Sequence, residues 1–287
     1  MKTGKIVWSL TAMILFSCII SGCKKGNKDW PSGLSGKILY SVRESINTNL
    51  TDHMYYVDSK QIKELGWGCG GRWSPDGSKI VYLFDCQDYQ MPPYIMNSDG
   101  TGAIEIPGPW NYSIPEWSPD GSRIAYQSDS IVITNTDGSN LIKLPSGFNP
   151  CWSLDGLEIY FQKSNAFWSI KLSDHSIHKL FDVPHAEYPI SYCWSPDRTR
   201  LLFDWKPATD PVIYSLYVMK VDGSAPIAIT TLHKYDHFSG YCWSPDGTKI
   251  AYSVTDRSDN GGLFVINLDG SDIQTILGIG PNVTDWH

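Results

Sequence analysis

A five-residue motif recurs along the chain and constrains its fold more than any other feature. The motif is Trp-Ser-Pro-Asp-Gly or a close variant, and it begins at Trp73, Trp117, Trp152, Trp194 and Trp243. These tryptophans lie 44, 35, 42 and 49 residues apart, and Trp286 follows the last of them by 43 residues. Self-similarity at a period of about 40 residues indicates a repeat architecture in which each unit is one small supersecondary element.

Each unit is expected to contain four antiparallel strands joined by tight turns. Proline fixes φ, aspartate bonds to nearby backbone N–H groups and glycine accepts a positive φ, so Ser-Pro-Asp-Gly predicts a hairpin turn between the first and second strands. The second strand is an apolar run such as residues 79–83, and a turn such as Asp99-Gly100 follows the third strand. Four strands in each period predict the blade of a β-propeller.

The two ends of the repeat array predict how the ring closes. Residues 36–65 supply the second, third and fourth strands of a unit, and residues 281–286 supply only a first strand. We therefore predict an all-β fold, a six-bladed β-propeller over residues 36–287 with four antiparallel strands per blade, in which the C-terminal strand completes the N-terminal blade. Trp30 is the alternative source of that strand, and it is disfavoured because it lies only seven residues after Cys23.

The repeated motif resembles the TolB-type β-propeller repeat, which is related in shape to WD-repeat propellers. The resemblance covers nearly all of residues 36–287. Leu154 replaces the proline of the third copy, and Arg198 replaces the glycine of the fourth, which puts the positive-φ turn there in doubt. The N-terminal α/β domain of TolB is not expected in this chain, so the resemblance implies the fold and not TolB's own role.

The first residues are expected to be a targeting segment. Two lysines precede an apolar run over residues 6–20, and Ile20-Ser21-Gly22-Cys23 resembles the lipobox of bacterial lipoproteins. The resemblance implies that residues 1–22 are a signal peptide and that Cys23 carries the lipid and begins the mature chain. Residues 23–35 then form a flexible lipidated tether. An ordinary secretory signal with a chance cysteine is the alternative.

The anchor and the charge define the expected surroundings. The lipid places the protein in the cell envelope, outside the cytoplasm, where it is periplasmic or surface-exposed. The formal net charge is −7 and no basic stripe is present, so nucleic acid is not an expected partner. The expected partners are the membrane, through the anchor, and an envelope protein or a glycan.

The cysteines do not form a complete disulfide framework or a zinc motif. The chain has seven, and Cys18 and Cys23 leave five, an odd number, with no zinc-ligand spacing. Cys151, Cys193 and Cys242 each precede a motif tryptophan in a different blade, so we expect small buried thiols. Cys69 and Cys86 flank one hairpin, and both a disulfide and free thiols remain open for them.

The two ends of the predicted ring differ. One, the turn end, carries the Ser-Pro-Asp-Gly and Asp-Gly turns. The other, the irregular end, carries loops of uneven length with many aromatic and ionisable residues, and such loops are where binding residues concentrate. The alternative for each aromatic ring is packing between blades. The candidate binding residues of the irregular end are Trp67, Trp110, Tyr112, His185, Glu187, Tyr188, Tyr192, Tyr235, Asp236, His237 and Tyr241.

Two functions are compatible with this pattern. The favoured one is a lipid-anchored binding or scaffold protein that uses the irregular end. The alternative is a propeller hydrolase or polysaccharide lyase with a site at the same end, where His185, Glu187 and His237 are the weak candidate metal ligands. They have no signature spacing, and no nucleophile elbow or phosphate-binding loop occurs. We therefore assign no catalytic residue and no cofactor.

Overall fold

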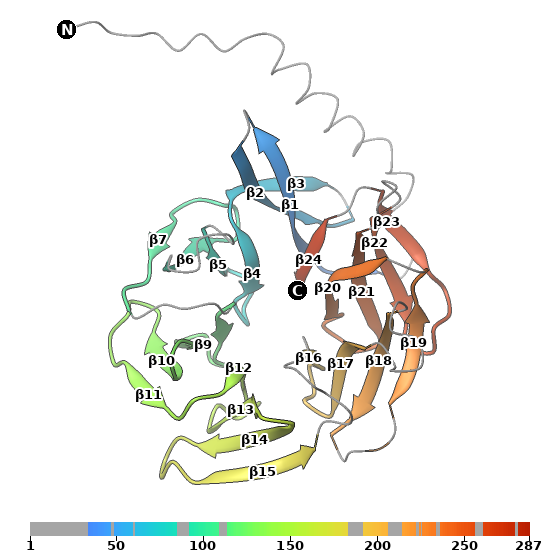
Figure 1. Ribbon diagram of the computed structural model, residues 1–287. Coiled ribbons are helices and arrows are strands. Elements are labelled where there is room, and N and C mark those ends of the chain that lie inside the picture. The colour runs from blue at the N-terminus through green and yellow to red at the C-terminus, as the bar shows by residue number, and fades with distance from the viewer. Residues whose placement is uncertain are drawn as a thin grey trace, which may run out of the picture.

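The computed structural model describes residues 34–46, 49–59, 61–84, 92–108, 114–182, 192–205, 214–221, 224, 226–233, 236–255, 261–278 and 281–287. In these residues, six antiparallel sheets of four strands stand around a central axis (Figure 1), which confirms the predicted six-bladed propeller. No helix of the described part is long and apolar enough to cross a membrane.

The four strands of each blade follow one another outward from the axis, and the closing strand β24 is the innermost strand of blade 1. Blade 1 consists of β24 (Asn282–Trp286), β1 (Ile38–Ile46), β2 (Asn49–Val57) and β3 (Ile62–Trp67); blade 2 of β4 (Cys69–Trp73), β5 (Lys79–Leu83), β6 (Pro93–Asn97) and β7 (Ile104–Glu105); blade 3 of β8 (Glu116–Trp117), β9 (Arg123–Gln127), β10 (Ile131–Asn135) and β11 (Ile142–Leu144); blade 4 of β12 (Phe148–Trp152), β13 (Glu158–Lys163), β14 (Ala166–Lys171) and β15 (Ile177–Asp182); blade 5 of β16 (Tyr192–Trp194), β17 (Arg200–Trp205), β18 (Ser215–Lys220) and β19 (Ile227–Thr231); and blade 6 of β20 (His237–Trp243), β21 (Lys249–Thr255), β22 (Gly262–Asn267) and β23 (Gln274–Leu277).

Each motif tryptophan is buried between its own blade and the blade before it. Trp152 packs on Ala125 and Ile131 of blade 3, and Trp243 packs on Leu202 of blade 5. A blade has two apolar faces, so it is stable only when both are covered. The tryptophans supply much of that cover, as expected for the core of the ring.

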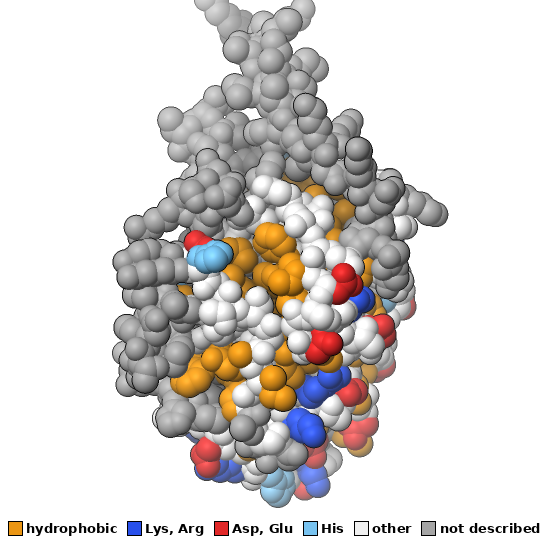
Figure 2. All heavy atoms as spheres, turned by 90° about the vertical axis from the view of Figure 1, so that its right-hand side faces the viewer, with side chains coloured by type: hydrophobic (Ala, Val, Ile, Leu, Met, Phe, Trp, Pro, Cys, Tyr) orange, Lys and Arg blue, Asp and Glu red, His pale blue; other side chains and the backbone are white. Residues whose placement is uncertain are grey.

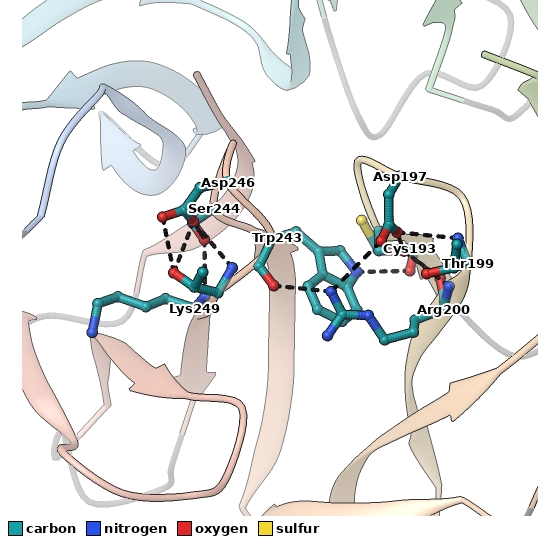
Figure 3. A network of polar contacts seen from close by, with 11 residues as sticks. Cys193, Asp197, Thr199, Arg200, Trp243, Ser244, Asp246 and Lys249 are labelled. Carbon is teal, nitrogen blue, oxygen red and sulfur yellow. Dashed lines mark hydrogen bonds and ion pairs between the residues drawn. The ribbon is translucent and has the colours of Figure 1, made fainter.

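The indole rings also make specific polar contacts across the blade junctions. Trp243 donates from Nε1 to the carbonyl of Cys193 at 3.0 Å, and the guanidinium of Arg200 lies 4.8 Å from the centre of its ring (Figure 3). Trp152 repeats the arrangement with the carbonyl of Glu116, at 3.3 Å, and with Arg123, at 4.7 Å. The hydrogen bond and the cation–π contact each fix one blade against the next.

The repeated turns are stabilised by their own side chains. In the first, Ser74 Oγ donates to Asp76 at 2.6 Å, and the N–H of Lys79 donates back to Ser74 Oγ at 2.9 Å. The same pair of bonds occurs in all five turns. Arg198 adopts a φ of +58° in place of the usual glycine, so the doubt about this turn is resolved. Its Nε donates to the carbonyl of Trp152 at 3.2 Å, which offsets the backbone strain.

The C-terminal strand closes the ring as predicted. β24 pairs antiparallel with β1, from Ile38 opposite Trp286 to Ser41 opposite Asn282. The strand is also tied to blade 2, because the N–H of Trp73 donates to Asp285 Oδ2 at 2.7 Å and Arg72 donates to the carbonyl of Thr284. Blade 1 is therefore held by both ends of the described chain.

One segment departs from the sequence prediction. Residues 43–52 join the second and third strands of their unit, where the sequence predicts a loop of the irregular end, but β1 and β2 continue through most of this segment as a two-stranded hairpin. Arg43 lies opposite Asp52 and its Nε is 3.1 Å from Asp52 Oδ1, so an ion pair joins the two strands. The hairpin projects beyond the ring at the top of Figure 1.

The closing strand carries a titratable group with a shifted pKa. Burial raises the pKa of Asp285 to about 6, although Arg72 and the N–H of Trp73 act to lower it, and the nearby Glu116 adds to the rise. The unfolded chain binds the same proton with a pKa of about 3.9. The folded protein therefore holds this proton more tightly, so the contribution of Asp285 to stability is largest below about pH 4 and is lost as the pH rises through 6.

We predict that Asp285→Asn removes this pH dependence. The amide oxygen still accepts from Trp73, but it cannot ionise. Relative to the parent, the variant should gain stability between pH 4.5 and 7.5, by at most about 3 kcal/mol, since one pKa unit corresponds to about 1.4 kcal/mol. Urea unfolding at several pH values measures this, with the exposed Asp129→Asn as the control. A difference that stays constant over this range would contradict the assignment.

Candidate functional site

At the turn end, the polar side chains of the repeated turns already form hydrogen bonds within their own turns. Each turn aspartate accepts bonds from the serine before it and from a backbone N–H after it, and these bonds lower the pKa of Asp76 and Asp120 to about 2. The third turn differs, because Leu154 and Leu157 stand in it and are 57% and 65% exposed. Nothing in the structure explains these two leucines. The remainder of this end is a repeated scaffold.

The residues immediately before the tryptophans form a second ring, which we call the channel ring. Arg72 Nε donates to Glu116 Oε1 at 3.0 Å, and Arg72 also interacts electrostatically with Asp285 and Cys193, so these side chains of the inner strands lie close to one another. The ring comprises Arg72, Glu116, Cys151, Cys193, Cys242 and Asp285.

The thiols of the channel ring are free and uncharged. Cys151, Cys193 and Cys242 form no disulfide; Cys151 and Cys242 are buried as predicted, whereas Cys193 is only partly buried. Burial raises the pKa of Cys151 to about 12 and that of Cys193 to about 11. A raised pKa favours the neutral thiol, which is the form that suits a packing role.

The described residues contain no cluster of three or more His, Cys, Asp or Glu side chains placed to hold a metal ion. Of the candidate ligands, His185 and Glu187 lie outside the described residues. His237 is exposed, and its ring lies 5.1 Å from that of Tyr214 in an edge-on contact.

Trp67 is the most exposed candidate aromatic side chain that the structure describes. It ends β3 at the irregular end and is 57% exposed. The glycines on either side have φ values of +114° and +144°, a region that other residues rarely adopt. A Cβ on Gly68 would lie 2.5 Å from the ring of Tyr82, so the chain passes tightly over blade 2 and presents Trp67 outward.

Two other candidates act as braces between blades. Tyr192 begins β16 and donates from its hydroxyl to the carbonyl of Asn149 in blade 4 at 2.9 Å. Tyr241 lies within β20 and donates to Asp204 Oδ1 of blade 5 at 2.8 Å. Burial raises the pKa of both hydroxyls well above the usual value. These contacts agree with the alternative that the two tyrosines pack between blades. A role for them in partner binding stays a prediction.

The remaining candidates are either at the start of β20 or outside the described residues. His237 is the first residue of β20, and Asp236 precedes it, with its N–H bonded to the carbonyl of His233 at 3.1 Å. The inner strand therefore starts earlier than the sequence predicted. Trp67 lies in blade 1, Tyr192 lies in blade 5, and the candidates at β20 lie in blade 6. Outside the described residues are Cys23, Trp110, Tyr112, His185, Glu187, Tyr188 and Tyr235.

Sequence reasoning missed the residues that surround Trp67. The ring of Phe84 lies 6.3 Å from that of Trp67, and the ring of His53 lies 6.1 Å from it. The segment Gly66-Trp67-Gly68 was the available signal, because glycines on both sides of a tryptophan indicate an unusual backbone. His53 lies opposite Trp67 through the pairing of β2 with β3, and Phe84, at the end of β5, comes close through the packing of blade 2 on blade 1.

Cys69 follows this segment and is disulfide-bonded. The three other described cysteines are free, so its partner lies outside the described residues. The pairing with Cys86 stays a prediction. The disulfide fixes the chain directly after the glycine-flanked Trp67.

The rim of the ring shows a mixed surface on the side where β19 and β23 lie. Figure 2 shows hydrophobic side chains in separate patches there, with lysine and arginine beside aspartate and glutamate. Exposed apolar residues of blades 5 and 6 include Ile227 and Ile273. Scattered apolar groups of this kind are ordinary for a protein surface.

Comparison with known proteins identifies the fold. No protein-family model and no curated protein sequence matches the chain. Among solved structures, TolB from Acinetobacter baumannii is similar with a TM-score of 0.67 and 17% identity, over 93% of this chain and 71% of that one. The putative TolB from Agrobacterium tumefaciens gives 0.57 and 16%, over 88% and 94%.

A structure described as oligogalacturonate lyase in complex with manganese is also similar, with a TM-score of 0.53 and 14% identity over 85% of this chain and 74% of that one. Identities this low establish a shared fold and not a shared activity. The chain therefore has the fold of the TolB-type six-bladed β-propellers.

Proposed function

We propose that this chain is a lipid-anchored binding protein of the cell envelope, which holds an envelope protein or an extracellular glycan at its irregular end. The observation that carries the proposal is the contrast between the two ends. At the turn end, the five repeated turns satisfy their own polar groups. At the irregular end, a constrained backbone displays Trp67, and large aromatic side chains on rigid supports are favourable contact residues.

The direction in which the described chain starts supports the same arrangement. Ser35 accepts a hydrogen bond from Trp286 Nε1 at 2.8 Å, and His287 packs on Gly77 of the first turn, so the chain enters the ring at the turn end. Ten residues lie between Cys23 and Leu34, and this stretch can span at most about 40 Å. A lipid on Cys23 would keep the turn end near the membrane and leave the irregular end facing away from it.

We predict that photo-crosslinks form at the irregular end. A benzophenone amino acid placed at Trp67 or at His237 should give adducts with a protein or a glycan in intact cells. The same group at Leu154 is a matched control at the turn end, because Leu154 and Trp67 are both 57% exposed. Gel mobility and mass spectrometry of the purified chain detect the adducts. Adducts that form at Leu154 and not at the other two positions would show that the wrong end was chosen.

We also predict that Cys23 is acylated. Mass spectrometry of the membrane fraction should find a lipid-modified peptide that begins at Cys23. Cys23→Ala should release the protein from the membrane with an unchanged melting temperature, because the described fold begins at Leu34. A mature protein that is free in solution and starts at another residue would refute the anchor.

A further inference from the structure

Trp67 and Phe84 form an exposed aromatic pair between blades 1 and 2. Their ring centroids are 6.3 Å apart and their planes are inclined at 54°. Trp67 is 57% exposed and Phe84 is 38% exposed. The pair continues inward, because Phe84 lies 5.6 Å from Tyr94, and Tyr94 lies 5.9 Å from the buried Tyr82. The outer rings are thus the accessible end of an aromatic ladder that is anchored in the core.

The backbone that carries Trp67 is held in a fixed conformation. The N–H of Gly68 donates to the carbonyl of Asp52 at 2.8 Å, and the disulfide at Cys69 fixes the next residue. Gly68 has no space for a side chain against Tyr82, so the backbone beside Trp67 is confined to one path. A ligand that stacks on a fixed ring loses little binding free energy to the ordering of that ring.

Two carboxylates lie beside the ladder. Glu64 Oε1 is 3.1 Å from Nδ1 of His53, whose ring contacts Trp67, and Glu105 Oε2 accepts from the hydroxyl of Tyr94 at 3.4 Å. The side chain of Glu64 is 40% exposed, so its carboxylate can accept further hydrogen bonds from a ligand.

The other ring nitrogen of His53, Nε2, is one of several buried side-chain atoms that have no hydrogen-bond partner within the described residues. A buried polar atom without a partner costs free energy. Nε2 itself is closed to a surface ligand, so the exposed carboxylate of Glu64 on Nδ1 is the part of this pair that a ligand can reach.

We propose that Trp67 and Phe84 are the stacking platform of a saccharide-binding site that takes a neutral pyranose. A pyranose ring has one face of C–H groups, which pack on an aromatic face, and a rim of hydroxyls, which donate to carboxylates such as Glu64 and Glu105. The inference deepens the proposed function, since it names the ligand class at the same end. Two rings are enough for one or two sugars, whereas a stable protein interface covers about 800 Å² on each partner.

The charges around the platform select against acidic sugars. Both flanking polar groups are carboxylates, and the nearby Arg43 is already paired with Asp52. The carboxylate of a uronic acid would therefore meet like charge, and like charges at close range are unfavourable. The site differs in this respect from one built to hold an acidic polysaccharide.

The test measures binding of defined oligosaccharides to the purified protein by isothermal titration calorimetry. The probes are cellohexaose, xylohexaose, maltohexaose and chitohexaose as neutral chains, and hexagalacturonate as the acidic chain. At least one neutral probe should bind, and Trp67→Ala should weaken its affinity by about tenfold or more. Trp67→Phe should retain part of the affinity, because it keeps an aromatic face.

Leu154→Ala is the matched control, since it removes an equally exposed apolar side chain at the turn end and should leave the affinity unchanged. Thermal melting of each variant checks that the fold is intact. The proposal is overturned if no neutral probe binds, if only hexagalacturonate binds, or if Trp67→Ala binds as the parent does. Crosslinks from Trp67 without saccharide binding would remove this inference and leave the proposed binding function in place.

Discussion

The contact between each motif tryptophan and the preceding blade is the interaction on which the rest of the ring depends. A four-stranded blade has two apolar faces and cannot cover them alone. The indole fills the wedge between blades, and at several junctions its N–H bonds to a carbonyl of the neighbouring inner strand, as Trp117 does with Arg72 at 3.1 Å. A cation from the preceding blade then covers the ring, as Lys37 does over Trp73. Hydrophobic burial, a hydrogen bond and a cation–π contact thus act at one place.

The sequence predicts this architecture well because its determinants are local. Ser-Pro-Asp-Gly contains the donors, the acceptor and the backbone preference of its own turn, so each copy marks a hairpin without knowledge of the neighbouring blades. The closing strand can be predicted from the number of strands in each unit, since residues 36–65 lack one strand and residues 281–286 supply it. Arg198 shows where a local rule is incomplete, because its bond to the carbonyl of Trp152 supports a φ that the residue type alone disfavours.

Features that depend on pairing between strands or on contacts between blades could not be predicted in the same way. The extension of β1 and β2 and the early start of β20 result from cross-strand pairing, and the braces formed by Tyr192 and Tyr241 end on atoms about 40 residues away. The sequence did identify Trp67 as a candidate. Phe84 and His53 became part of the site only when the fold placed their rings within about 6 Å of it.

The two ends of the ring are suited to different roles. The turn end repeats one hydrogen-bonded unit and receives the N-terminal side of the described chain, which suits attachment. The irregular end departs from the repeat, and it presents an aromatic ladder whose inner rings belong to the core. A rigid ring allows exposed side chains to be held in fixed positions, so the proposed binding function relies on the same blade junctions that give stability.

The blade junctions offer a direct test with an internal control. Trp243 bonds to the carbonyl of Cys193 and lies under Arg200, whereas Nε1 of Trp194 is buried without a partner among the described residues. Tryptophan to phenylalanine removes the same atoms at both positions, so the difference between the two variants isolates the polar contacts of the indole. Urea unfolding should show that Trp243→Phe lowers the free energy of unfolding by about 1–3 kcal/mol more than Trp194→Phe does. Equal losses, or a larger loss for Trp194→Phe, would contradict the account of how the ring is held together.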